Sequence, residues 1–309
     1  MVFFMSTFDP FIKQSYERHS EHLKCYQQGS AKEAHAQRWL LPNTVDSWRH
    51  KRMYDLVLPI LKNDPNTTWL TVGDGRFGLD AQYIMSNGSA CMATDISDTL
   101  LIEAKQKNLI NDYQIENAEA LSFDDNQFDY TFCKESFHHF PRPIIALYEM
   151  LRVSKKAAVL IEPSDPLTTP TPLKVLFQNF KKMIKFILKK DNSEHHYEEV
   201  GNYIYKLSIK EITKIAIAQN FSTIATKGIN DVYLSGVENE MVEDHGPLLK
   251  KTKRRIFLYD LLCLLRLQDH LLVSVVIFKS QPSKATIEAL IKHRYTIVHL
   301  PQNPHMNFN

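Results

Sequence analysis

The chain has 309 residues, of which 44% are apolar and 23% charged, a balance typical of a soluble globular protein with one large domain or two small ones. A formal net charge of +2 is far below the clustered basic excess of nucleic-acid-binding proteins, so we expect no nucleic-acid partner. The four cysteines are scattered, without the paired spacing of a disulfide framework or a zinc site. We therefore expect reduced thiols, no bound metal and a cytoplasmic protein.

Two apolar stretches fail the criteria for targeting or membrane segments. The N-terminal run lacks a positively charged flank and is interrupted by Ser6, Thr7 and Asp9, so we expect neither a signal peptide nor an anchor there. The longest apolar stretch, Ile256 to Phe278, contains acidic and basic residues. We therefore expect no transmembrane helix from it.

Residues 10–62 predict a helical lead-in, because a sparse apolar stripe recurs at helical spacing among polar residues, most clearly from Val45 to Leu61. The sequence Asp64-Pro65-Asn66 ends this pattern. We assign residues 1–66 to the lead-in.

From residue 67 onward, short apolar runs alternate with helical patterns. The predicted strands are Thr68–Val72, Cys91–Thr94, Tyr113–Glu116, Phe128–Cys133 and Ala157–Glu162. The predicted helices between them are Phe77–Met85, Leu100–Asn108 and Pro143–Arg152. This alternation predicts an α/β fold, a Rossmann-like, doubly wound and mostly parallel sheet with helices on both faces.

After the fifth strand, prolines mark a long connection, and we assign residues 164–206 to a helical insertion or lid that contains the helix Leu173–Lys190. A helix from Ser208 to Gln219 follows. Two further strands, Phe221–Leu234 and Leu271–Lys279, flank the very apolar helix Arg254–Leu267, which we expect to be buried or, less favoured, to form a dimer face. The main domain then covers residues 67–280, and 281–309 form a C-terminal extension.

A glycine-rich turn follows the first strand, with the sequence Val72-Gly73-Asp74-Gly75-Arg76-Phe77-Gly78. In an open α/β sheet, ligands bind at the carboxyl ends of the strands, where glycines let backbone amides and a helix N-terminus approach the ligand. Glycine turns also occur after strands that bind nothing. The turn alone is therefore ambiguous.

Asp95 ends the second strand, about 20 residues after the glycines, where an acidic side chain can accept hydrogen bonds from both hydroxyls of a ribose. The alternative is that Asp95 caps the second helix, although Ser97 could do this as well. At this point a nicotinamide-dinucleotide enzyme remains open.

The third and fourth strands carry the most specific signal. The sequences NAEALSFDDNQFDY (117–130) and TFCKESFHHF (131–140), continued by EMLRV (149–153), closely resemble the methyltransferase type 11 group of class I S-adenosylmethionine-dependent methyltransferases. The resemblance covers roughly Trp69 to Glu162. It implies a seven-stranded sheet with an antiparallel last strand, S-adenosylmethionine as the cofactor and S-adenosylhomocysteine as the product.

The resemblance also implies roles for individual residues. Gly73, Asp74 and Gly75 would lie beside the methionine moiety, and Lys134 and Glu135 near its amino and carboxylate groups. The ribose and adenine contacts would come from Asp95, Ile96, Asn117, Ala118 and Glu119. In similar enzymes a lead-in helix closes over the cofactor. Here this helix would place Trp48 over the cofactor and let Arg49 hold the methionine carboxylate. The alternative is a solvated arginine beside a tryptophan packed on the sheet.

The chain departs from the family pattern at three positions. Thr71 replaces the acidic residue that usually opens the glycine motif, Phe77 replaces the third glycine, and Asn117 replaces the usual aspartate of the adenine loop. We expect Asp74 to take over the missing acid; a decayed cofactor site is the alternative.

For the acceptor we expect a small molecule, methylated on an oxygen of a saccharide or a lipid-linked precursor. His138 or His139 could be the general base; alternatively, one packs in the core and the other faces solvent. Residues 173–190 combine an apolar face with many lysines, which indicates a docked lid or peripheral membrane contact. The competing functions are a catalytically silent methyltransferase-like protein and an NAD-dependent oxidoreductase.

Overall fold

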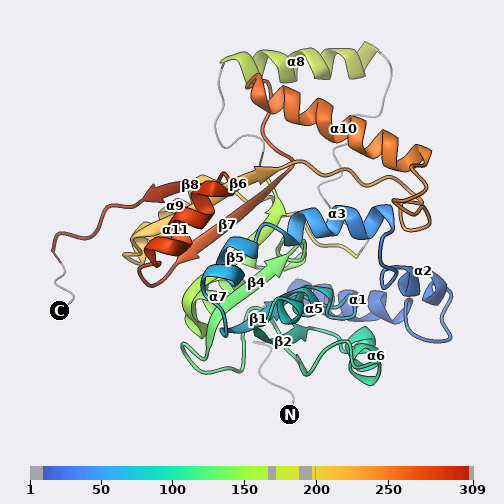
Figure 1. The fold of residues 1–309 in the computed structure, drawn as a ribbon, viewed down its shortest axis with the longest axis horizontal. Helices are drawn as coiled ribbons and strands as arrows, with labels where there is room; N and C mark the ends of the chain where they lie inside the picture. The colour runs from blue at the N-terminus through green and yellow to red at the C-terminus, as the bar shows by residue number, and fades with distance from the viewer. Residues whose placement is uncertain (1–9, 166–171, 188–196, 199, 306–309) are drawn as a thin grey trace.

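The computed structural model describes residues 10–165, 172–187, 197–198 and 200–305 (Figure 1). The lead-in forms four helices, α1 (Pro10–Lys24), α2 (Glu33–Arg38), α3 (Val45–Tyr54) and α4 (Leu58–Asn63). Thr44 is the N-cap of α3, and its side chain accepts a hydrogen bond from the Ser47 amide. The predicted helical lead-in is confirmed for these residues.

The parallel part of the sheet alternates with helices as predicted. Its strands are β1 (Thr68–Val72), β2 (Ala90–Asp95), β3 (Tyr113–Ile115), β4 (Phe128–Lys134) and β5 (Ser154–Pro163). The intervening helices are α5 (Leu79–Ser86), α6 (Thr99–Gln106), the 3₁₀ turn η1 (Phe137–His139) and α7 (Pro143–Val153). Pro143 opens α7, where its missing N–H costs nothing.

The C-terminal half adds α8 (Pro172–Ile187), α9 (Ile209–Ala218), β6 (Thr223–Ile229), α10 (Pro247–Leu264), β7 (Leu272–Phe278), α11 (Lys284–Lys292) and β8 (Thr296–His299). The predicted helix from Leu173 ends, among described residues, at Ile187; residues 188–190 lie outside them. β6 ends five residues earlier than predicted.

The strand order is β3-β2-β1-β4-β5-β7-β6-β8, with β7 antiparallel to both of its neighbours. The predicted α/β fold class with a mostly parallel sheet is therefore confirmed. One strand is additional, since β8 pairs antiparallel with β6 within residues that we had assigned to the extension. Its four residues are too short a run to show strand alternation in the sequence.

Two apolar clusters cover the two faces of the sheet, because alternate residues of each strand point to opposite sides. Trp69 and Phe132 lie on one face with residues of α4, α5 and α11, whereas Leu70 and Cys133 lie on the other with residues of α7 and α9. The two clusters form the core, and the carboxyl ends of β1, β2 and β4 emerge between them.

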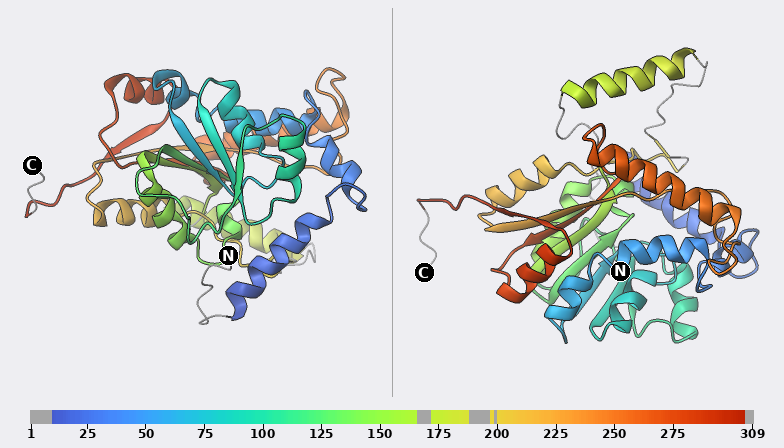
Figure 2. Two further views of the ribbon diagram at one scale, coloured as in Figure 1. Left: turned by 90° about the horizontal axis from the view of Figure 1, so that it is seen from below. Right: turned by 45° about the horizontal axis from the view of Figure 1, so that its top comes forward.

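α8 and α10 lie side by side beyond one edge of this core (Figures 1 and 2). Lys174 and Lys181 of α8 contact Asp269 and Gln268, which follow α10. The expectation that the apolar helix would be buried is wrong, because Phe257 and Leu264 are 65% and 78% exposed. Only one side of α10, with Leu249 and Ile256, packs inward. Within the described residues, no helix is long and apolar enough to cross a membrane.

Candidate cofactor site

The glycine turn is tied to the ends of two neighbouring strands. The Gly73 and Asp74 amides both donate to the Thr94 carbonyl of β2 at 2.9 Å, and the Ser136 hydroxyl after β4 donates to the Gly73 carbonyl at 2.6 Å. Gly73 has a φ of +78°, and a Cβ there would lie 2.5 Å from the Ser136 Cβ. Glycine is therefore required at this position both by conformation and by space.

Gly75 and Asp95 form a matched pair. A Cβ on Gly75 would lie 2.7 Å from Asp95 Oδ2, so the absent side chain is what allows the carboxylate to lie against the turn. The Ser97 amide donates to Asp95 Oδ1 at 3.0 Å and orients it. Burial raises the pKa of Asp95 to about 6. The structure thus brings together the turn and the acidic residue, as the sequence predicted.

Asp74 points away from this pair. Its carboxylate accepts hydrogen bonds from the Thr71 hydroxyl at 2.9 Å and from the amides of Asp80 and Ala81 at 3.1 and 2.9 Å. It therefore caps the N-terminus of α5, with Thr71 in the family's acidic position as its partner. Burial and the neighbouring Asp80 raise the pKa of Asp74. These contacts favour a structural role and not the replacement of the missing acid.

Lys134 and Glu135, at the end of β4, lie in a network of charged groups. Lys134 Nζ is 3.2 Å from Glu135 Oε2, 3.3 Å from His50 Nδ1 and 3.8 Å from Asp80 Oδ1. Tyr54 places its ring 5.0 Å from the same ammonium and donates to Asp80 at 2.9 Å. Burial opposes the charge on Lys134, but the Asp80 and Glu135 carboxylates outweigh it and raise the Lys134 pKa.

Glu135 is the partly open member of this network. Burial opposes its ionisation, but Lys134 and His50 together hold its pKa well below the ordinary range. Burial also lowers the pKa of His50 well below its usual value. The Glu135 side chain remains 29% exposed and therefore offers an ionised carboxylate at the end of β4.

Four residues in or near this network were not predicted from the sequence: His50, Tyr54, Asp80 and Arg76. His50 and Tyr54 are four residues apart and so share one face of α3, a spacing that could have indicated them once that face was known to meet β4. The exposed Arg76 places its guanidinium 4.7 Å from the Trp39 ring, and its charge lowers the pKa values of both Glu135 and His50.

Trp48 and Arg49 lie on a different face of α3. Arg49 is buried and pairs with Asp46 at 2.7 Å and with Asp231, so its guanidinium has its anionic partners within the chain. Trp48 packs near Val45 and lies within cation–π distance of Arg52 and Lys253. Arg49 is neither the solvated arginine of the alternative nor free to hold a carboxylate.

The loop after β3 is held by its own side chains. Asn117 Oδ1 accepts a hydrogen bond from the Glu119 amide at 2.9 Å, which closes a local turn. The buried Glu119 carboxylate accepts from the Arg142 amide and Nε at 2.7 and 2.6 Å. The loop's side chains are thus used internally, while Ala118 is buried and Ile96, after Asp95, is half-buried.

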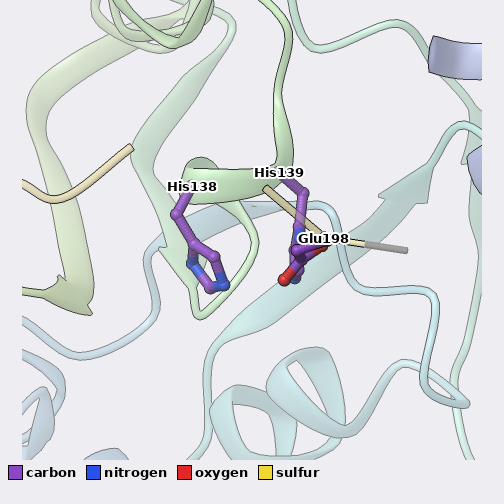
Figure 3. Close-up of side chains that lie close together, drawn as sticks. All are labelled: His138, His139 and Glu198. Atoms are coloured by element: carbon purple, nitrogen blue, oxygen red, sulfur yellow. Dashed lines mark hydrogen bonds and ion pairs between the residues drawn. The ribbon is translucent and has the colours of Figure 1, made fainter. Parts of the chain in front are cut away.

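His138 and His139 lie together in η1, just past β4, with ring centroids 4.0 Å apart (Figure 3). His138 Nδ1 lies 2.7 Å from Glu162 Oε2, and His139 Nδ1 lies 2.6 Å from Glu198 Oε2. The fully buried Glu162 also accepts the Ser136 and Phe137 amides, each at 2.9 Å. Both histidines therefore pair with carboxylates, which neither sequence-based alternative foresaw.

A separate cavity of about 420 Å³ lies beside β6 and β7, and its lining includes Asp165, Lys210, Lys214 and His270. None of the predicted site residues lines it. It is distinct from the cluster of residues at the ends of β1, β2 and β4.

Comparisons with known proteins find similarity to methyltransferases. Residues 70–161 match the family model described as a methyltransferase domain. A demethylmenaquinone methyltransferase of Staphylococcus carnosus is 30% identical over 161 residues, which cover 47% of this chain and 65% of that protein. A ubiquinone biosynthesis O-methyltransferase of Coxiella burnetii is 31% identical over 123 residues, covering 38% and 47%. The chain thus spans about half to two thirds of the length of these relatives.

Among solved structures, the magnesium protoporphyrin IX methyltransferase of Synechocystis, with bound S-adenosylhomocysteine, aligns with a TM-score of 0.45 and 14% identity over 86% of this chain and 95% of that one. A protein of Galdieria sulphuraria described as a sarcosine dimethylglycine methyltransferase aligns with a TM-score of 0.46 and 16% identity. The alignment covers 76% of this chain and 85% of that one.

Proposed function

We propose that the methyltransferase domain matched by residues 70–161 is of the class I, S-adenosylmethionine-dependent type, and that the protein methylates an oxygen of a small, lipid-linked acceptor. S-adenosylmethionine is the donor and S-adenosylhomocysteine the product. The observation that carries the proposal is the fit of Gly75 against the Asp95 carboxylate at the adjacent ends of β1 and β2. This is where an open α/β sheet binds a nucleoside.

In this proposal the cofactor spans the ends of β2, β1 and β4. Asp95 accepts hydrogen bonds from the ribose hydroxyls, and the adenine lies between Ile96 and the backbone at Ala118. The methionine moiety lies beside Gly73 and Gly75. Glu135, ionised and partly exposed, faces its ammonium group, which is the electrostatic match for a carboxylate.

We assign the methionine carboxylate to Arg76 and not to Arg49. The Arg49 guanidinium is engaged by two aspartates, whereas Arg76 is exposed, next to the glycines and close enough to act electrostatically on the network around Lys134. A guanidinium can hold a carboxylate through two parallel hydrogen bonds. Trp48 then has a packing role between α3 and α10.

The chemistry requires little from the protein beyond alignment and the exclusion of water, because the sulfonium makes the methyl group reactive. The acceptor oxygen attacks the methyl carbon as the carbon–sulfur bond breaks, and the electron pair of that bond stays on sulfur. The hydroxyl proton of the acceptor is released to solvent water. His138 and His139 lie just past Ser136, which contacts the glycine turn, so we place the acceptor oxygen at these histidines.

The acceptor class follows from the exposed surface of α8 and α10. Leu176 and Phe186 of α8 are 67% and 76% exposed, and Phe257 and Leu264 of α10 lie on the neighbouring helix. Exposed apolar side chains among lysines suit a hydrocarbon tail at an anionic membrane surface. The names of the two relatives support a quinone-type ring. We therefore favour a lipid-linked phenol over a saccharide.

Radiolabelled S-adenosylmethionine tests the acceptor directly. We expect label on a hydroxylated benzenoid ring with a prenyl tail, and lower kcat/KM for the same ring without the tail. Each buried methylene contributes about 0.8 kcal/mol of binding free energy, so burying one prenyl unit should raise kcat/KM at least about tenfold. Leu176→Asp and Phe186→Asp should lower transfer to the tailed acceptor alone, with Ile291→Asp, an exposed residue of α11, as the control. Equal transfer to both rings, or label on a saccharide only, contradicts the proposal.

A further inference from the structure

Three side chains around η1 converge on one point. His138, His139 and Glu198 each offer a ligand atom, and these atoms all lie within 4.8 Å of one another (Figure 3). His139 and Glu198 are 59 residues apart in the sequence, so no spacing motif could reveal the cluster. Imidazole nitrogen and carboxylate oxygen are common ligands of divalent transition metals.

The first of these ligands is already oriented. Glu162 pairs with His138 Nδ1 and is itself fixed by the amides of Ser136 and Phe137. This leaves His138 Nε2 as the nitrogen available for coordination. A carboxylate that holds the outer nitrogen of a histidine, as here, orients the ring and raises its basicity as a metal ligand.

A third imidazole completes the surroundings. His19 of α1 places its ring centroid 5.6 Å from that of His139. Among the residues that the structure describes, the buried His19 Nε2 has no hydrogen-bond partner of good geometry, and the Asn202 side chain is its polar neighbour. A buried polar atom of this kind carries a desolvation penalty unless something binds it. The cluster thus draws on α1, η1 and the segment at residues 197–198.

We propose that His138, His139 and Glu198 bind a divalent metal ion of the zinc type, with His19 lining the remaining side. Two histidines and one glutamate form a three-ligand set that leaves a coordination position open, as in catalytic zinc sites. This revises the expectation of no metal, which was based on cysteine spacing alone. The cluster lies at η1, directly after Ser136, whose hydroxyl contacts the glycine turn of the proposed cofactor site.

The consequence for the acceptor rests on the proposed function. An acceptor hydroxyl at the open position would lose its proton more readily, because a bound cation lowers the pKa of an oxygen ligand. The histidines would then hold the metal, and neither would be the free general base that the sequence suggested. Metal binding itself does not depend on methyl transfer.

The test uses the full chain without a polyhistidine tag, freed of metal by a chelator. It is titrated with Zn²⁺ in a calorimeter and with Co²⁺ in a spectrophotometer. We expect one ion per chain and the intense visible absorption of low-symmetry four-coordinate Co²⁺. His139→Ala and Glu198→Gln should each weaken binding by at least about tenfold. His22→Ala, which removes another histidine of α1, is the control and should bind as the wild type does.

The outcomes separate this proposal from the proposed function. S-adenosylhomocysteine affinity, measured on the same metal-free samples, should be within about twofold of wild type in His139→Ala and Glu198→Gln, because neither side chain contacts the glycine turn or Asp95 in the structure. Circular dichroism confirms that both variants are folded. Absence of metal binding, or equal binding by Glu198→Gln and wild type, overturns the metal site and leaves the cofactor site intact.

Discussion

Replacing Asp95 by alanine is expected to weaken S-adenosylhomocysteine binding by about 100-fold. In the proposed site the carboxylate accepts hydrogen bonds from both ribose hydroxyls. A hydrogen bond to a charged group contributes about 1.5–3 kcal/mol, so losing both costs at least about 3 kcal/mol of binding free energy. Gly75 leaves the space that this carboxylate occupies, and Ser97 orients it. Isothermal titration calorimetry at neutral pH measures the change. Asp98→Ala is the matched control, because Asp98 makes no capping hydrogen bond.

The same residue predicts a pH dependence. Burial raises the pKa of Asp95 to about 6, and only the ionised carboxylate can accept from two hydroxyls. Affinity should therefore fall by up to about tenfold for each pH unit below that value, while Asp95→Asn shows no such slope. The stability of the free protein should change with pH in the opposite direction to the affinity. Because the pKa of Asp95 is raised in the folded state, its contribution to the free energy of unfolding declines as the pH rises from 3.8 to about 6. Wild-type affinity in Asp95→Ala contradicts the ribose assignment.

Replacing Glu162 by alanine should have the largest effect on stability, a loss of about 3–5 kcal/mol in the free energy of unfolding. The side chain is fully buried and accepts the Ser136 and Phe137 amides at 2.9 Å while pairing with His138. Alanine leaves these groups buried without a partner, and each such group costs about 1–3 kcal/mol. Urea unfolding followed by circular dichroism measures the loss.

Two further variants test whether the loss of stability in Glu162→Ala comes from the buried hydrogen bonds. Glu162→Gln retains one oxygen for the two amides and should lose less than Glu162→Ala. Glu211→Ala removes an exposed carboxylate that accepts the Tyr205 hydroxyl, and it should change the unfolding free energy by no more than about 0.5 kcal/mol. A loss below about 1 kcal/mol in Glu162→Ala would show that the turn after β4 does not depend on this carboxylate.

The sheet and the glycine turn could be predicted from the sequence because both are local signals. Apolar runs of strand length alternate with helical patterns, and Gly73 and Gly75 stand directly after the first of these runs. The short edge strand β8 and the exposed side of α10 could not, since neither is specified by periodicity. An apolar helix has the same pattern whether it packs against a core or, like α10, lies beside another exposed helix.

The directions of charged side chains were the least predictable feature. Arg49 pairs with Asp231, which is 182 residues away, and Lys134 contacts His50, which is 84 residues away. Asp74 was expected to face the cofactor, yet it caps α5 because the helix begins only five residues later. A residue next to a glycine turn can point to either side of it, and only the packed structure decides which.

The most direct test of the account is calorimetric titration of the purified chain with S-adenosylhomocysteine and, separately, with NAD. We predict saturable binding of one S-adenosylhomocysteine per chain and no heat of binding with NAD, because residues 70–161, which include Gly73, Gly75 and Asp95, match a methyltransferase domain. Binding of NAD without binding of S-adenosylhomocysteine would contradict it.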